Sequence, residues 1–156
     1  MSAFLIVKLG RQVVVGLAAC LLVAPVGAAL QPLKPTDVMP GCGCGFYASE
    51  ARDAPLLLHW SQIGGRQAVM RDGNKLYYIG LHNARYYPTE RNPAQNGDRM
   101  VLYFATPQWQ VQAVGTVVDA CRSKQSSCAT VYKARLLVQY EGGAQQSTEV
   151  VGRCGC

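Results

Sequence analysis

The chain has 156 residues and carries 15 Lys and Arg against nine Asp and Glu, which gives a formal net charge of +6. This length suits one domain with a core of its own. The basic residues are dispersed along the chain and form no cluster. The charge therefore argues against a nucleic-acid-binding protein and is consistent with solubility or with an acidic partner.

Residues 1–29 have the pattern of an export signal. Lys8 and Arg11 precede an apolar run over 13–30, and small residues follow Pro25 near its end. A basic start, an apolar stretch and a small-residue cleavage site are what a signal peptidase recognises. We therefore expect a cleaved signal peptide over 1–29 and a periplasmic or secreted protein.

The same run contains a pattern that predicts a different processing route. Leu17-Ala18-Ala19-Cys20 matches the bacterial lipobox, in which the cysteine is lipidated and becomes the new N-terminus. The alternative is therefore a membrane-anchored lipoprotein held at Cys20. The apolar residues that follow Cys20 argue against it, because a lipoprotein normally continues with a polar, flexible segment. An uncleaved run would be just long enough to span a bilayer.

Three prolines between residues 30 and 41 predict an extended lead-in, and residues 42–156 are expected to form a single domain. In that domain apolar residues alternate with polar ones, most clearly over 132–141, which is typical of half-buried antiparallel strands. Turn residues such as Asp72-Gly73 separate the alternating runs. The sequence therefore predicts an all-β fold, a single small antiparallel sandwich or barrel of about seven strands.

Six cysteines lie beyond the expected signal peptide, at 42, 44, 121, 128, 154 and 156. An even number of cysteines in an exported domain of this size predicts a disulfide framework. Cys121 and Cys128 flank a short turn and are expected to bridge the base of a hairpin.

The other four cysteines form two Cys-Gly-Cys motifs at the ends of the domain. A bridge within one motif is strained, so pairing between the motifs is favoured. On adjacent antiparallel strands the pairs would be Cys42–Cys156 and Cys44–Cys154. The alternative is a four-cysteine site for Zn or Cu(I) formed by the same residues, although a spacing of one residue is unusual for structural zinc. A third interpretation is redox exchange through labile disulfides.

Groups for catalysis are scarce. The only histidines are His59, on an expected strand, and His82, at the start of an irregular stretch. The sequence contains no motif of a nucleophilic hydrolase, a metalloprotease or a phosphate-binding loop. We expect both histidines to be structural residues, no cofactor, and a protein that is not an enzyme.

The stretch His82–Asp98 (HNARYYPTERNPAQNGD) is expected to be one long irregular loop, because it contains two prolines, a glycine and several Asn and Asp residues. Tyrosine and arginine, which are enriched in protein interfaces, gather in it and on its approach strand. The candidate binding surface consists of Tyr78, Arg85, Tyr86, Tyr87 and Arg91. The alternative is that these tyrosines only cover the edge of the core.

These observations favour a non-catalytic binding module of the bacterial envelope, such as an inhibitor or immunity-type protein with a protein partner and no nucleic acid. One alternative is a metal-binding protein that uses the two Cys-Gly-Cys motifs. Another is a structural envelope lipoprotein anchored at Cys20. The sequence leaves the partner and the oligomeric state open.

Overall fold

The structure is a computed structural model, and it describes residues 30–62, 66–88, 94–121 and 128–155. The expected signal peptide, with the lipobox cysteine Cys20, lies outside the described residues, as do Arg91 and Cys156. The described residues contain no helix that is long and apolar enough to cross a membrane.

The described residues form nine strands and one short 3-10 helix. In chain order these are β1 (Leu30–Gln31), η1 (Pro35–Asp37), β2 (Gly43–Tyr47), β3 (Leu56–Ser61), β4 (Gln67–Asp72), β5 (Lys75–Tyr87), β6 (Arg99–Ala105), β7 (Trp109–Asp119), β8 (Ala129–Tyr140) and β9 (Gln146–Gly155).

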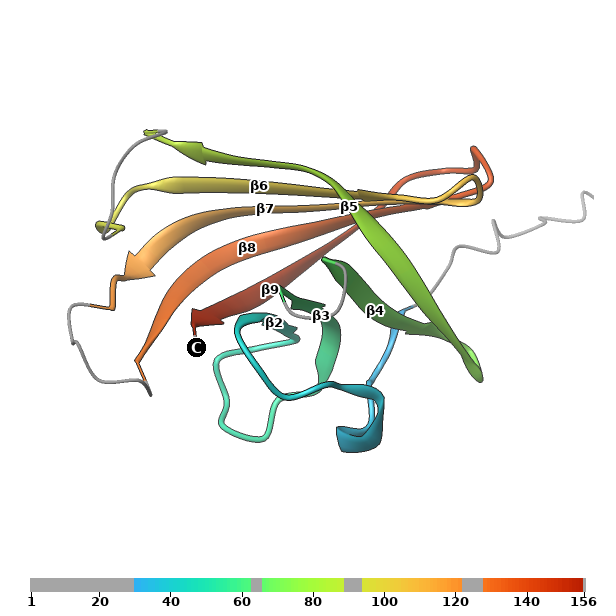
Figure 1. The fold of residues 1–156 in the computed structure, drawn as a ribbon, viewed down its shortest axis with the longest axis horizontal. Coiled ribbons are helices and arrows are strands. Elements are labelled where there is room, and N and C mark those ends of the chain that lie inside the picture. Colours follow the sequence, from blue (N-terminus) through green and yellow to red (C-terminus); the bar gives the residue numbers. More distant parts are fainter. Residues whose placement is uncertain (1–29, 63–65, 89–93, 122–127, 156) are drawn as a thin grey trace, which may run out of the picture.

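The strands β2 to β9 form a closed antiparallel barrel (Figure 1). Each strand pairs with the next one along the chain, and β9 returns to pair with β2. The short strand β1 is an addition beside β4. The prediction of a disulfide-reinforced antiparallel all-β fold is confirmed, and of the two expected architectures the structure is the barrel, with eight strands instead of about seven.

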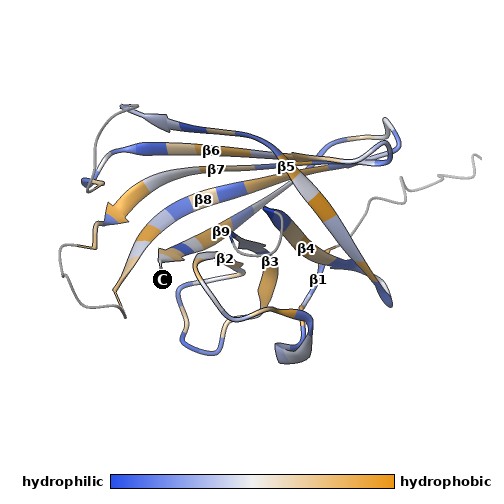
Figure 2. Cartoon of the chain, viewed as in Figure 1, coloured by the Kyte–Doolittle hydropathy of each residue, from blue (hydrophilic) through white to orange (hydrophobic). Residues whose placement is uncertain are grey.

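Side chains fill the inside of the barrel. The largest fully buried ones are Trp109, Phe46, Phe104, Leu58, Met70, Ile79, Met100, Leu102, Leu136 and Val111. Successive residues of a strand point to opposite faces, so every second residue of the long strands reaches this core. Figure 2 shows the resulting bands of hydrophobic and hydrophilic residues along the long strands. An eight-stranded barrel is just wide enough to be filled in this way, so its outer face offers the room for a binding partner.

The segment expected as an extended lead-in, 30–41, lies against the barrel. The backbone N–H of Leu33 donates a hydrogen bond of 2.7 Å to the Leu56 carbonyl, and the Leu33 side chain is buried. The Asp37 carboxylate pairs with the Arg71 guanidinium of β4 at 2.8 Å. The segment therefore packs on the outside of β3 and β4.

One expectation about the chain is wrong. The first six residues of the stretch His82–Asp98 are not an irregular loop, because β5 continues through them to Tyr87. These residues pair in register with β6, after a bulge between Leu81 and Asn83. Every residue from His82 to Tyr87 is exposed, so this half of the strand has no alternation of buried and exposed positions. The sequence therefore lacks the period-two signal there.

Two of the expected disulfides are confirmed. Cys44 of β2 and Cys154 of β9 face each other in the strand register and are bonded, across a sequence separation of 110 residues. Cys121 and Cys128 are bonded across a separation of seven residues. Cys42 is also disulfide-bonded, and its expected partner Cys156 is outside the described residues.

Candidate functional site

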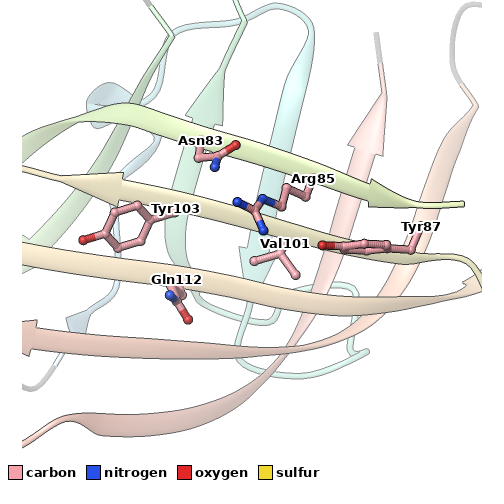
Figure 3. A pocket seen from close by; sticks show the side chains of 6 residues that line it. All are labelled: Asn83, Arg85, Tyr87, Val101, Tyr103 and Gln112. Carbon is pink, nitrogen blue, oxygen red and sulfur yellow. The ribbon is translucent and has the colours of Figure 1, made fainter. Parts of the chain in front are cut away.

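A groove of about 410 Å³ crosses the outer face of β5, β6 and β7. Its lining consists of Asn83, Arg85 and Tyr87 from β5, Val101 and Tyr103 from β6, and Gln112 from β7. Figure 3 shows the Arg85 side chain over Val101, with Tyr103 on one side and Tyr87 on the other. We call this surface the outer groove.

The strand pattern explains why these side chains meet. Residues two apart in a strand share a face, so Asn83, Arg85 and Tyr87 all point outward from β5. The pairing register places Arg85 beside Val101 and Asn83 beside Tyr103. The intervening residues of β6 are completely buried in the core. The outer groove is therefore carried by strands that the core holds in place.

The outer groove combines one positive charge with aromatic and amide groups. No carboxylate of the described residues forms an ion pair with Arg85, and β5 and β6 contain no Asp or Glu. The exposed His82 ring makes an edge contact with Tyr103, with 5.7 Å between ring centroids. These groups can donate hydrogen bonds, stack and attract an anion.

The structure brings together only part of the predicted binding surface. Arg85 and Tyr87 lie in the outer groove, while Tyr86 points to the opposite side of the sheet. Burial raises the pKa of the Tyr86 phenol, and Tyr86 in turn contributes to the raised pKa of the core residue Tyr132, although burial is the larger cause there. Tyr78 lies elsewhere, and Arg91 is outside the described residues.

The residues that β6 and β7 contribute to the groove, Val101, Tyr103 and Gln112, are not among those predicted from the sequence. A signal for Tyr103 was present. It alternates with the apolar residues Leu102 and Phe104, so it occupies the outward phase of a strand. Tyr103 lies near Arg85 because of the register between β5 and β6. A single sequence does not show this register.

Tyr78 lines a second, smaller cavity of about 130 Å³, which lies between the lead-in and the outer face of β3, β4 and β5. His59 is also in its lining, half-buried as expected for a strand residue. Burial lowers the pKa of His59, opposed by a hydrogen bond with the Met39 backbone. Its buried Nε2 atom has no hydrogen-bond partner among the described residues. The volume corresponds to a few water molecules, so the outer groove is the better candidate for a macromolecular partner.

The cysteines do not assemble a metal site in this oxidised state. The sulfur atoms of Cys44 and Cys154 are bonded to each other, so two of the four thiolates that the metal alternative needs are consumed. Within the described ranges, no group of three or more His, Cys, Asp or Glu side chains is arranged to hold a metal ion. Cys44 is only 3% exposed, whereas its bonded partner Cys154 is half-buried.

Comparison with known proteins does not place the chain in a family. No protein-family model, no curated protein and no solved structure matches it.

Proposed function

We propose that the protein is a non-catalytic binding module exported to the bacterial envelope, of the inhibitor or immunity type, and that it holds a protein partner in the outer groove. The observation that carries this proposal is the position of Arg85 over Val101 and between two tyrosines, on strands fixed by the core. Arg and Tyr are the residue types that most often dominate protein interfaces.

The covalent structure supports an export route. Disulfides form and persist in oxidising compartments outside the cytosol, and Cys44–Cys154 and Cys121–Cys128 are both formed. The apolar run over 13–30 provides a means of export. We propose the periplasm or the exterior as the place of action, with a lipid anchor at Cys20 as the alternative.

The charge of the groove supports an acidic partner. The Arg85 guanidinium is exposed and has no carboxylate beside it in the described structure, and the chain as a whole is basic. A partner carboxylate placed over Val101 would form a charge-assisted hydrogen bond with Arg85. The flanking tyrosines would shield that bond from water, as the surroundings of an interface hot spot do.

The test is a capture experiment with the oxidised protein and an envelope extract of the source organism. Arg85→Glu and Tyr103→Ala should each reduce recovery of the partner at least about tenfold, in the range of hot-spot substitutions. Arg52→Glu is the matched control for charge, because Arg52 is exposed in the loop between β2 and β3, away from the groove. Tyr78→Ala is the matched control for the loss of an exposed tyrosine.

All four variants should keep the melting temperature of the wild type within a few degrees, since the substituted side chains are at least partly exposed. A partner that is captured equally well by Arg85→Glu, Tyr103→Ala and the wild type would contradict the proposed use of the outer groove.

A further inference from the structure

The pairing between β4 and β5 ends before β5 does. The two strands pair from Asp72 with Lys75 as far as Gln67 with Gly80. One more hydrogen bond of 2.9 Å follows, from the Leu81 N–H to the Arg66 carbonyl. Beyond it β5 continues to Tyr87, and β6 is its only strand neighbour in the described structure. Figure 1 shows this end of β5 as the outer edge of the sheet.

This free edge, residues 82–87, is about 20 Å long at the usual rise of a strand. On the side away from β6, its backbone N–H and C=O groups have no strand partner among the described residues, so they are available for pairing with another strand. A closed barrel normally leaves no such edge. Residues 83–87 of this edge pair with β6 on their other side. The edge is therefore already in the extended conformation that an added strand requires.

A hollow lies on each side of the free edge. The outer groove is on one side, and on the other is a hollow of about 310 Å³ lined by Trp60, Gln62, Arg66, Leu81 and Ala84. Trp60 is 4% exposed, and its Nε1 atom is buried without a hydrogen-bond partner among the described residues. Successive side chains of an added strand would enter the two hollows alternately.

We propose that the free edge binds an extended segment of the partner as an additional strand, with acidic side chains on the outer face and apolar side chains on the inner face. This inference rests on the proposed function and specifies how the partner binds. The outer hollow supplies Arg85, which has no ion-pair partner among the described residues. The inner hollow supplies the apolar groups of Trp60, Leu81 and Ala84, beside the polar side chains of Gln62 and Arg66.

The charge of Arg85 favours an acidic partner segment over a second copy of the chain as the strand that pairs with the free edge. Two copies joined antiparallel through residues 82–87 would bring their Arg85 side chains close together on one face, and like charges on neighbouring strands destabilise a sheet. The free edge contributes no carboxylate to offset this repulsion. An acidic segment instead neutralises the cation.

The probe is a synthetic peptide of eight alternating Glu and Val residues, titrated into the oxidised full-length protein. Binding is followed by NMR, together with the exchange rates of the backbone amides. The peptide should slow exchange at every second amide of residues 82–87 by at least about tenfold at saturation. A peptide of alternating Lys and Val residues should bind at least about tenfold more weakly, because its charges face Arg85.

Two controls separate backbone pairing from simple attraction of charge. N-methylation of the Glu/Val peptide at every second amide, prepared in both registers, should abolish binding in at least one register. The variant Arg85→Glu should reverse the preference between the two peptides, while Arg52→Glu should leave it unchanged.

The proposal is overturned if the Glu/Val peptide does not bind, if both N-methylated peptides bind as well as the parent, or if exchange at 82–87 does not change. It is also overturned if sedimentation shows a dimer in which these amides are protected without peptide. In each case the proposed function is judged separately, by whether capture of the partner depends on Arg85 and Tyr103.

Discussion

Two strand-to-strand contacts of the barrel, which we call seams, differ in how completely their strands are joined. Where β9 meets β2, five residue pairs lie in register and the Cys44–Cys154 disulfide joins the strands. Where β4 meets β5, the pairing ends at Gly80 and β5 continues without a second strand neighbour in the described structure. The first seam closes the barrel, and the second leaves an edge free. The disulfide therefore lies at the seam that joins the two ends of the barrel sequence, and the free edge lies at a seam without a disulfide between its strands.

The disulfide of the closed seam offsets a large loss of chain entropy on folding. It joins the first and last strands of the barrel, and its disulfide spans 110 residues of sequence. Bringing such distant segments together costs the unfolded chain more entropy than any hairpin does. The Cys121–Cys128 bridge, by contrast, joins neighbouring strands over seven residues, so it contributes less to closure and more to the alignment of β7 and β8.

Removing the bonds of the closed seam should have the largest effect on stability. The variant with Cys42, Cys44, Cys154 and Cys156 all replaced by Ala should lose about 5 kcal/mol of unfolding free energy, in the chain-entropy account of disulfides. The matched control, Cys121→Ala with Cys128→Ala, closes a much shorter loop and should lose about 2 kcal/mol. Urea denaturation of the oxidised proteins measures both. Equal losses would contradict the special role of the closed seam.

Glycine substitutions compare the packing of β2 against β3, next to the closed seam, with that of β5 at the partly open seam. A Cβ atom added at Gly43 of β2 would collide with the backbone carbonyl oxygen of Trp60, whereas one added at Gly80 of β5 meets nothing within 4 Å. Gly43→Ala should therefore cost about 3 kcal/mol, because the backbone of β3 must move. Gly80→Ala should change stability by less than about 0.5 kcal/mol. Thermal unfolding compares the two variants, and a similar cost for both would refute the difference in packing.

A smaller effect is expected from pH, through His59 on the outer face of β3. Burial lowers the pKa of His59 from its usual 6.5, so the unfolded chain binds the proton more tightly than the folded one. Stability should be complete above about pH 6.5 and fall as the pH drops below it towards the lowered value. His59→Gln should weaken this dependence, and the exposed His82→Gln should retain it. The measurement is the urea midpoint between pH 7.5 and 5.

The parts of the fold that follow from local patterns were predictable. Alternation over 132–141 gives β8 because one face of that strand is buried and the other is not. The Cys-Gly-Cys spacing places two thiols on one face of a strand, which is why the Cys44–Cys154 pairing could be expected. The end of β5 could not be found in this way. Both of its faces are exposed, so its sequence, HNARYY, resembles a loop.

The candidate site was predictable only in part, for a related reason. The prediction of a loop over 82–98 places Tyr86 on the same surface as Arg85 and Tyr87. In a strand, however, adjacent residues point to opposite faces. Tyr78 was assigned to the same surface because it is near in sequence, yet it lies about 20 Å before Arg85 along an extended strand. Val101 and Tyr103 reach Arg85 through the pairing of β5 with β6, and this register becomes visible only in three dimensions.

The central claim is that one seam of the barrel is closed and the other presents a free edge. Native-state hydrogen exchange of the oxidised protein, measured residue by residue without any partner, tests it most directly. The amides that pair β2 with β9 should exchange only through global unfolding. Every second amide of residues 82–87 should exchange at least about a hundredfold faster, because no strand covers it. Exchange at all of these amides as slow as that in β2 would contradict the account.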